Sequence, residues 1–252
     1  MIEVRNTTKS YRGSIVVDDV SISLPAGGVI SLIGPNGAGK STLLSIISRL
    51  LPASAGTVTV DGMDVATTPG DVLARRLSIL RQDNQMTARL TVRDLVAFGR
   101  YPYGKGRLTA EDEIHIRRVI GYLELDAHAG RFLDELSGGQ RQRAFIAMVL
   151  CQDTDYVLLD EPLNNLDVKH AVAMMKLFRR TADEFGKTVI LVLHDINFAS
   201  CYSDRIVAMR DGRIVYEGPP ETIITPEVIH DVYGVRADIH EIDGKRMALY
   251  FR

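Results

Sequence analysis

The chain has 252 residues, of which 46% are hydrophobic and 25% are charged, and its formal net charge is −2. This length can bury a sizeable core, and the composition is that of an ordinary globular protein. The evenly mixed charges argue against a nucleic-acid-binding protein, which needs a basic surface. No apolar run reaches the ~20 residues that span a bilayer, and the first residues lack the apolar core of a signal peptide, so we expect a cytosolic protein.

The predicted strands share a richness in Val, Ile and Leu and are separated by segments with helical or turn patterns. They cover residues 15–24, 28–33, 57–60, 156–159 and 188–193. The last two are continuous apolar runs, which is typical of strands that are covered on both faces. The alternation of strands with helical patterns predicts an α/β fold with a parallel-sheet core.

The middle of the chain favours helices. From about residue 91 to residue 135 the β-prone pattern fades, and charged, helix-forming residues dominate. Thr109 stands directly before Ala-Glu-Asp-Glu, where its hydroxyl can cap a helix. We therefore expect a helical subdomain of about residues 88–150, inserted in the core.

The last part of the chain favours hairpins. Asp211-Gly212 and Asp243-Gly244 are turn signals that each stand between β-prone runs, and residues 226–233 have a helical pattern. These elements predict a C-terminal β-hairpin extension of about residues 205–252. We expect residues 1–252 to form a single domain that includes this extension and the helical insertion.

Residues 34–42, GPNGAGKST, fit the phosphate-binding pattern G-x-x-x-x-G-K-[ST] in full, between a predicted strand and a predicted helix. Glycines let successive backbone N–H groups face one concavity, and the helix N-terminus adds partial positive charge there. Lys40 is expected to reach the β and γ phosphates of a nucleotide, and Ser41 to ligate Mg²⁺. The nucleotide-binding residues predicted from this loop are Gly34, Asn36, Gly37, Gly39, Lys40, Ser41 and Thr42.

An acidic pair, Asp160-Glu161, follows the buried run at residues 156–159. Asp160 can hold the hydration shell of Mg²⁺, and Glu161 can polarise a water towards the γ phosphate. Alone, such a pair would more often be the start of a loop. Together with a phosphate loop, it predicts a site that hydrolyses a nucleotide.

Residues 136–140, LSGGQ, resemble the signature motif of ABC-type ATPases. Other motifs of that family occur in the family's order over most of the chain: Tyr11 in KSY, Gln82 in LRQD, Asn-Leu-Asp at residues 165–167, and His194 after TVILVL. The resemblance implies a P-loop NTPase with the ABC-ATPase fold. That fold has an N-terminal antiparallel β subdomain, a parallel-sheet core and an inserted helical subdomain.

The resemblance also implies roles for the matching residues. Tyr11 would stack on adenine, Gln82 would touch Mg²⁺ or the attacking water, and His194 would contact the γ phosphate and order that water. Asp167 belongs to a segment that contacts a second subunit, although it could also cap the following helix. The Asn164-Asn165 pair departs from the small Ser-Ala often found there, which leaves the details of that contact open.

ATPases of this family form a head-to-tail homodimer, in which the signature motif of one subunit faces the phosphate loop of the other across ATP. The residues that the resemblance assigns to this second phosphate cradle are Ser137, Gly138, Gly139 and Gln140. Their amides and the Ser137 hydroxyl, at the start of a helix, can bind the partner's γ phosphate. From spacing alone, Ser137 would be an ordinary helix N-cap.

Residues 91–103, TVRDLVAFGRYPY, are similar to a segment of bacterial ferric-siderophore and cobalamin importers, and residues 194–218 are similar to the same branch. This resemblance implies transmembrane permease subunits, which would be contacted through a groove around residues 85–94. It further implies ATP and Mg²⁺ as cofactors, an indirect partner in a periplasmic or lipoprotein substrate-binding protein, and a place on the cytoplasmic face of the cell membrane. The alternative is that residues 99–107, GRYPYGKGR, form only a helix-breaking loop.

Ferric siderophore is the substrate that this resemblance favours, with haem or cobalamin as the alternative. The sequence does not exclude an exporter ATPase, because the permease largely sets the direction of transport. A soluble ABC protein would normally carry tandem cassettes or a coiled-coil insertion, and this chain has one cassette without heptads. A small-molecule kinase would need the phosphate loop but no signature motif. The choice of siderophore, the permease and the role of the C-terminal hairpin are open at this level.

Overall fold

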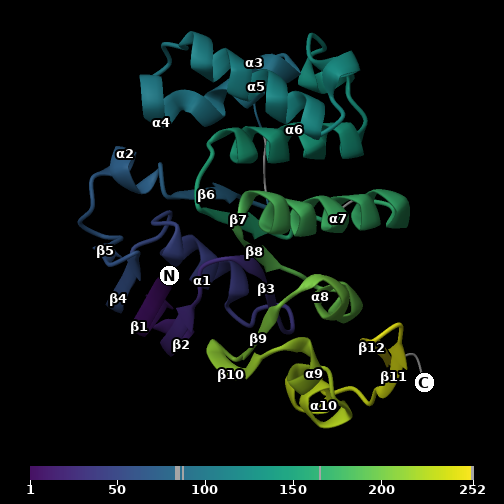
Figure 1. Ribbon diagram of the computed structural model, residues 1–252. Coiled ribbons are helices and arrows are strands. Elements are labelled where there is room, and N and C mark those ends of the chain that lie inside the picture. The colour runs from purple at the N-terminus through teal and green to yellow at the C-terminus, as the bar shows by residue number, and fades with distance from the viewer. Residues whose placement is uncertain (83–85, 87, 165, 251–252) are drawn as a thin grey trace. The chain divides into compact units, whose positions relative to one another are not determined.

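The computed structural model describes residues 1–82, 86, 88–164 and 166–250. The chain divides into two compact units, Met1–Thr68 with Met174–Arg252 and Pro69–Ala173. Helix α7 (Val168–Phe185) contains the boundary between them (Figure 1). Within the described part of the chain, no helix is both long and apolar enough to cross a membrane.

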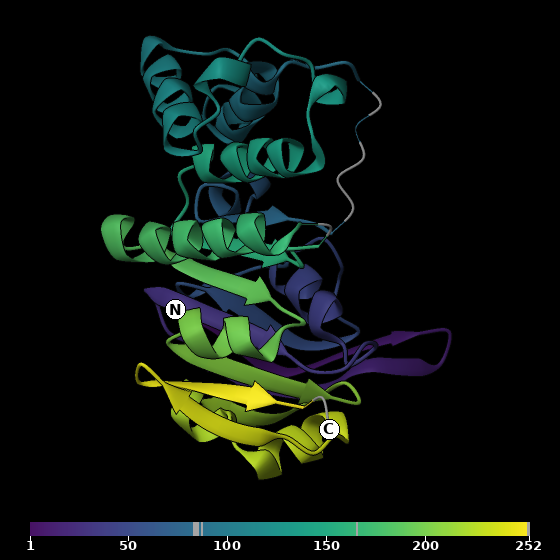
Figure 2. The same cartoon turned by 90° about the vertical axis from the view of Figure 1, so that its right-hand side faces the viewer.

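The first unit begins with an antiparallel sheet whose strand order is β2-β1-β4-β5. Its strands are β1 (Ile2–Tyr11), β2 (Ser14–Leu24), β4 (Ala55–Val60) and β5 (Met63–Asp64). Ile2 pairs with Leu24 on one side and with Val60 on the other, and all three side chains are buried. Figure 2 shows β1 and β2 as a long hairpin (purple). The expected antiparallel subdomain is therefore present.

A parallel sheet forms the rest of the core of this unit. β3 (Gly28–Ile33) pairs in parallel with β8 (Thr188–Val192) on one side and with β9 (Arg205–Arg210) on the other. Every residue of β8 is buried, as expected for a strand that is covered on both faces. The parallel core is thus confirmed. β3 leads through the glycine-rich loop into α1 (Lys40–Ile47).

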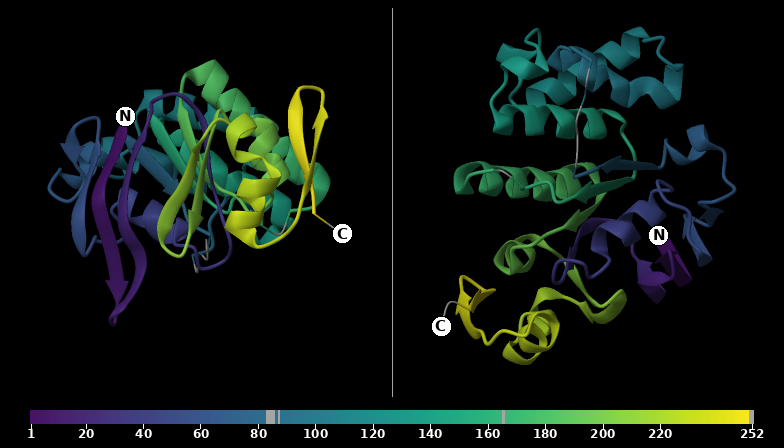
Figure 3. Two further views of the ribbon diagram at one scale, coloured as in Figure 1. Left: turned by 90° about the horizontal axis from the view of Figure 1, so that it is seen from below. Right: turned by 180° about the vertical axis from the view of Figure 1, so that it is seen from behind.

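Both predicted C-terminal hairpins are present. They are β9 with β10 (Arg213–Gly218) and β11 (Asp238–Ile242) with β12 (Lys245–Leu249), and α9 (Pro220–Ile223) and α10 (Pro226–Tyr233) lie between them (Figures 1 and 3). Asn197, in α8 (Ile196–Tyr202), accepts from the N–H of Ala248 at 2.8 Å and donates to its carbonyl at 3.2 Å. This side-chain amide attaches the last hairpin to α8.

The second unit is mostly helical, apart from two parallel strands, β6 (Leu77–Leu80) and β7 (Tyr156–Asp160). Its helices are α2 (Gly70–Leu73), α3 (Val92–Ala97), α4 (Tyr101–Gly104), α5 (Ala110–Tyr122) and α6 (Gly138–Cys151), with 3-10 turns η1 (Phe98–Arg100), η2 (Asp126–His128) and η3 (Leu133–Glu135). α3 to α6 gather as one group (teal in Figure 1). The helical pattern is thus confirmed, while the subdomain limits near residues 88 and 150 stay a prediction.

A buried ion pair joins the helices of this second unit. Arg100 donates from Nε to Asp112 Oδ1 at 2.7 Å, and the two side chains are 7% and 4% exposed. Asp112 also closes the capping box of α5, where it accepts from the N–H and the hydroxyl of Thr109 at 2.9 and 2.8 Å. Burial tends to raise the pKa of Asp112, but the hydrogen bonds from Thr109 and Arg100 outweigh it and hold the pKa at about 2.

We expect Asp112→Asn to lower the free energy of unfolding at pH 7 by about 3 kcal/mol, because it leaves Arg100 buried without its counter-charge. The folded-state pKa of Asp112 lies below the unfolded value, so its stabilising contribution is complete above about pH 4 and is lost as the pH falls towards 2. Urea unfolding at pH 7 and between pH 4 and pH 3 measures both effects.

The matched control is Asp155→Asn, which breaks an exposed ion pair with Arg76 and should cost less than about 1 kcal/mol. The stability difference between the wild type and Asp112→Asn should narrow in the acidic window. A difference that stays constant from pH 7 to pH 3 would contradict the assigned pKa.

Candidate functional site

The phosphate loop connects the end of β3 to the start of α1. Gly39 is the N-cap of α1 with φ of 96°, and Gly34 has φ of 140°. Both values lie in the region that favours glycine. A Cβ at Gly34 would lie 2.0 Å from the carbonyl oxygen of Met209. One at Gly39 would lie 2.5 Å from the carbonyl oxygen of Val16. Conformation and close approach of the neighbouring backbone therefore both require glycine here.

Lys40 begins α1 and folds back over the loop. It is 5% exposed, and its Nζ donates to the carbonyl oxygens of Gly34 at 2.8 Å and Pro35 at 2.9 Å. Gly37 has φ of 81°, and no atom lies within 4 Å of the place where its Cβ would be. The lysine and the N-terminus of α1 together concentrate positive potential at one concavity. The loop thus fits the polyphosphate chain of a nucleotide.

The turn between β9 and β10 supports the phosphate loop. Gly212 donates its N–H to the carbonyl of Ala38 at 3.2 Å and accepts from the N–H of Asp18 at 2.9 Å. Arg213 pairs with the carboxylate of Asp18 at 2.7 Å. The turn at Asp211-Gly212 is predictable from the sequence, but its contact with a loop so much earlier in the chain is not.

Asp160 and Glu161 lie at the end of β7, as predicted. Asp160 is 8% exposed, whereas Glu161 is half-buried and has φ of 50°, a left-handed conformation that is uncommon for a residue with a Cβ. Oε2 of Glu161 accepts from Nε2 of Gln82 at 2.7 Å and from Nδ2 of Asn164 at 2.5 Å. The structure therefore brings Gln82 and Glu161 together, and Asn164 adds a donor that the sequence did not reveal.

The signature segment opens helix α6. Ser137 is the N-cap: its Oγ accepts from the N–H of Gln140 at 3.4 Å, while Oε1 of Gln140 accepts from the N–H of Ser137 at 3.0 Å. These reciprocal bonds form a capping box. Gly138 and Gly139 form the first turn, whose amides have no acceptor within a helix and can bind an anion. Ser137 is thus a helix cap, and this placement is also compatible with phosphate binding.

His128 contacts the signature segment from η2. Because Oε1 of Gln140 faces the N–H of Ser137, Nε2 of Gln140 must donate to Nε2 of His128, 3.1 Å away. His128 therefore accepts at Nε2. Nδ1 is buried and has no hydrogen-bond partner among the described residues. A lone histidine gives no signal in the sequence, so this contact was not predicted.

Asp167 and His170 lie on the other side of the signature segment. Oδ1 of Asp167 accepts from the backbone N–H of His170 at 2.8 Å and lies 2.7 Å from its Nδ1. These two hydrogen bonds hold the pKa of Asp167 below its usual value. The ring of His170 lies against Gly139, since a Cβ on Gly139 would meet its Cδ2 at 3.4 Å. The helix-cap alternative for Asp167 is thus confirmed, and its contact with a second subunit stays a prediction.

Two further predicted residues, Tyr11 and His194, lie at strand ends. Tyr11 ends β1 and is 44% exposed, with Nζ of Lys9 at 5.1 Å from the ring centroid. His194 is exposed, follows β8 and precedes Asp195, whose side chain caps α8. Both placements leave the side chains accessible to a nucleotide.

The predicted site residues are divided between the two units. Tyr11, the phosphate loop and His194 belong to the first unit. The second unit contains Gln82, the acidic pair, the signature segment and Asp167. Asn165 of the predicted subunit contact and residues 85 and 87 of the predicted permease groove lie outside the described residues.

The residues predicted to hold Mg²⁺ offer oxygen ligands, which this hard cation prefers. Ser41 supplies a hydroxyl from α1, and Asp160 supplies a carboxylate from the end of β7. Gln82 directs its Nε2 to Glu161, so its amide oxygen faces away from that carboxylate. The oxygen atoms of these three side chains are therefore suitable ligands for Mg²⁺.

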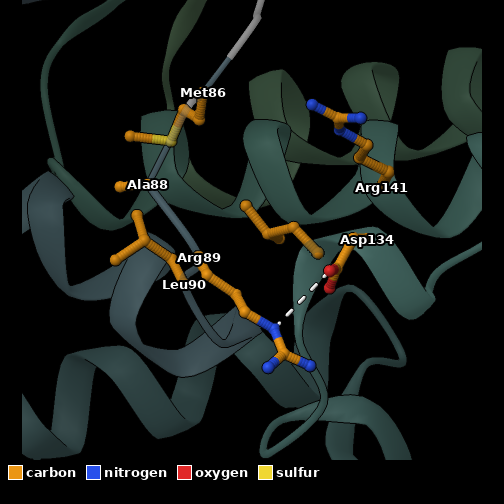
Figure 4. A pocket seen from close by; sticks show the side chains of 7 residues that line it. Met86, Ala88, Arg89, Leu90, Asp134 and Arg141 are labelled. Atoms are coloured by element: carbon orange, nitrogen blue, oxygen red, sulfur yellow. Dashed lines mark ion pairs between the residues drawn. The ribbon is translucent and has the colours of Figure 1, made fainter.

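A cavity of about 170 Å³ lies beside the signature segment. It is lined by Met86, Ala88, Arg89, Leu90, Leu133, Asp134 and Arg141. Arg89 points to Asp134, with 3.5 Å between Nε and Oδ2, and Arg141 stands on α6 (Figure 4). The guanidinium of Arg89 also lies 4.0 Å from the ring centroid of Phe132. The cavity includes part of the predicted permease groove at residues 85–94, and its lining combines apolar side chains with two arginines and an aspartate.

The comparison with known families matches this arrangement. The model of the ABC transporter family matches residues 17–164, from β2 to the turn after the acidic pair. This is more than half of the chain. The chain belongs to the ABC transporter family. It is an ATP-binding cassette, and its activity is ATP hydrolysis.

Several curated relatives match nearly the whole cassette. The petrobactin import ATP-binding protein YclP of Bacillus subtilis is 53% identical over 251 residues and 100% of both chains. The petrobactin import ATP-binding protein FatE of Bacillus anthracis is 53% identical over 95% of this chain and 96% of the relative. The ferric enterobactin transport ATP-binding protein FepC of Escherichia coli is 40% identical over 92% and 86%.

Solved structures share the fold of the cassette. The dimeric ATP-binding cassette MJ0796, in a post-hydrolysis state with ADP and Pi, has a TM-score of 0.78 at 30% identity and covers 87% of this chain and 99% of its own. A metal-chelate type ABC transporter in an inward-facing conformation has a TM-score of 0.85 at 21% identity, over 100% and 97%. The second likeness concerns the fold alone. The expected ABC-ATPase fold is confirmed.

The bond between His128 and Gln140 gives a prediction for the start of α6. His128→Leu removes the acceptor at similar volume, whereas His128→Gln places an amide oxygen near the same point. We expect faster amide hydrogen exchange at residues 138–141 in His128→Leu and near wild-type exchange in His128→Gln. Exchange monitored by mass spectrometry on peptides from this segment measures the effect. Equal exchange in all three proteins would show that the capping box does not depend on His128.

Proposed function

We propose that this cassette is the ATP-hydrolysing subunit of an importer for ferric siderophores. The observation that carries the proposal is the 53% identity to two petrobactin import ATP-binding proteins, over 100% and 95% of this chain. Relatives named for iron(3+)-hydroxamate and ferric enterobactin transport follow at 38% and 40% identity. Petrobactin is therefore the first substrate to test.

In the proposed mechanism, the phosphate loop binds the polyphosphate of ATP. Lys40 exchanges the carbonyls of Gly34 and Pro35 for phosphate oxygens. The loop residues that contribute to this cradle are Gly34, Asn36, Gly37, Gly39, Ser41 and Thr42. Bound Mg²⁺ would neutralise charge on the β and γ phosphates, and Ser41, Gln82 and Asp160 would hold it.

Glu161 is the proposed general base for the attacking water. Its carboxylate is oriented by the two amide donors on Oε2, from Gln82 and Asn164. Oε1, on the other side of the carboxylate, is the atom that would take the proton of the water. His194 would contact the γ phosphate, and Tyr11 would stack on adenine. Hydrolysis would then depend on Glu161, whose backbone has the left-handed conformation described above.

The second half of the proposed site comes from a head-to-tail partner copy. Ser137, Gly138, Gly139 and Gln140 would bind the γ phosphate on the partner's phosphate loop, with Asp167 at the same interface. The dimeric state of the 30% identical MJ0796 cassette supports this arrangement. ATP would close the dimer, and hydrolysis would reopen it.

The proposed transport partners are membrane permease subunits at the cytoplasmic face of the cell membrane. A cytoplasmic segment of the permease would dock at the cavity of Figure 4, beside Arg89 and the signature segment. Its lining of apolar side chains mixed with Arg89, Asp134 and Arg141 suits an amphipathic helix. A periplasmic or lipoprotein substrate-binding protein would take part only through the permease.

Glu161→Gln tests the base and the dimer together. We expect kcat to fall by about 100-fold or more, since the amide cannot accept the proton of the water. ATP affinity should stay near the wild-type value, and ATP should drive the variant into dimers on size-exclusion chromatography. Glu184→Gln on α7, an exposed acid paired with Arg180, is the control and should change nothing. Near-normal turnover would show that Glu161 is not the base. A lack of ATP-driven dimers would contradict the proposal that Ser137, Gly138, Gly139 and Gln140 bind the γ phosphate of a partner copy.

Uptake of radiolabelled iron tests the substrate. Cells carry either the wild-type cassette or Glu161→Gln, and receive iron as petrobactin, enterobactin or hydroxamate complexes. We expect uptake of the petrobactin complex to fall about tenfold or more in the variant cells, because the permease loses its source of free energy. The other complexes should enter normally. If every complex enters the wild-type and the Glu161→Gln cells equally, the siderophore proposal fails. Import of haem or cobalamin, and export, are then the remaining candidate functions.

A further inference from the structure

The C-terminal helix α10 touches the phosphate loop through its last residue. The hydroxyl of Tyr233 accepts a hydrogen bond from the N–H of Gly34 at 2.9 Å, across 199 residues of sequence. Burial raises the pKa of Tyr233, and the bond from Gly34 lowers it only in part, so the hydroxyl is neutral at physiological pH. A neutral phenol oxygen is a suitable acceptor for a backbone amide.

The N–H of Gly34 needs this acceptor because the sheet ends just before it. β3 pairs with β8 as far as Leu32 and with β9 as far as Ile33. Gly34 itself is buried, so an unpaired amide at this position would be costly. The hydroxyl of Tyr233 extends the hydrogen bonding of the strand by one residue, to the first glycine of the phosphate loop.

Helix α10 is fixed firmly enough to present this hydroxyl. Its apolar face is buried, with Val228, Ile229 and Val232 at 9%, 0% and 2% exposure. Asp231, on the polar side, pairs with Arg210 of β9 at 2.6 Å, and its carboxylate raises the pKa of Tyr216 in β10. The helix is therefore attached to the same hairpin that supports the other end of the phosphate loop.

The backbone groups of Gly34 have three different partners. Its N–H bonds to Tyr233, its carbonyl accepts from Lys40, and its Cα packs against the carbonyl of Met209. Without the tyrosine hydroxyl, the peptide before Gly34 could rotate to find another acceptor, since glycine tolerates many φ values. Such loop conformations would not present the remaining amides to phosphate.

We propose that Tyr233 is a positioning residue for ATP binding, which holds the phosphate loop in its binding conformation through the N–H of Gly34. The C-terminal extension thereby contributes to the nucleotide site without touching the nucleotide. Loss of the hydroxyl lowers the fraction of loops that are competent to bind, and the apparent dissociation constant rises by the same factor. The chemical step, which takes place with ATP already bound, is unaffected.

The test is Tyr233→Phe, which removes one oxygen and keeps the ring. We expect the dissociation constant for ATP to rise about five- to tenfold, with kcat at saturating ATP within about twofold of wild type. The matched control is Tyr216→Phe, which removes the β10 hydroxyl whose pKa Asp231 of α10 raises, and which leaves the bond between Tyr233 and Gly34 in place. Its ATP affinity should equal that of the wild type. Isothermal titration with ATP and steady-state ATPase assays on the full chain give the required values.

The outcomes separate positioning from general stability. A Tyr233→Phe protein that binds ATP with wild-type affinity overturns the proposal, even if its melting temperature falls. Equal weakening in Tyr216→Phe also overturns it, because the effect would then come from the packing of α10. A fall in kcat at unchanged ATP affinity would assign the hydroxyl to the chemical step instead. Thermal unfolding followed by circular dichroism confirms that both variants are folded.

Discussion

The close approach of backbone to backbone around the phosphate loop is the constraint on which the nucleotide site depends. The carbonyl oxygens of Met209 and Val16 occupy the places where Gly34 and Gly39 would carry side chains. The loop is therefore shaped by its surroundings as much as by its own sequence. β3 can end in this loop only because β9 and its turn run beside it, and the turn fixes Ala38 through Gly212.

The second unit arranges the proposed catalytic groups by amide hydrogen bonds. Glu161 takes two of them, from Gln82 and Asn164, at the point where the chain leaves β7 in a left-handed conformation. The start of α6 is organised in the same way, since Gln140 links Ser137 to His128. Gln142 of the same helix donates to the carbonyl of Pro162 at 3.0 Å, which ties α6 to the turn after Glu161. The signature segment and the acidic pair of one subunit are thus one connected network.

Local motifs made much of this predictable. The phosphate loop, the acidic pair and the Thr109 cap depend on residues that are close in sequence, and the structure places all of them as expected. β1 was missed because IEVRNTTKSY mixes Asn, Thr and Lys with few apolar residues, so pairing with β2 and β4 defines it more than its own pattern does. β6 is only LSIL, too short to separate from a helix by periodicity. His128 and Tyr233 act through contacts that only the folded chain creates.

Lys40 shows what this arrangement means for turnover. The ammonium group is almost buried and is already solvated by two carbonyl dipoles of its own loop. If ATP binds as proposed, phosphate oxygens replace these two carbonyls around the ammonium group, and the reverse exchange accompanies the departure of the product. The net gain for the lysine is only the difference between phosphate and carbonyl oxygens. In the proposed cycle, a cassette that must release its product at each turnover would benefit from this small difference, because a lysine without the two carbonyl contacts would hold the product more tightly.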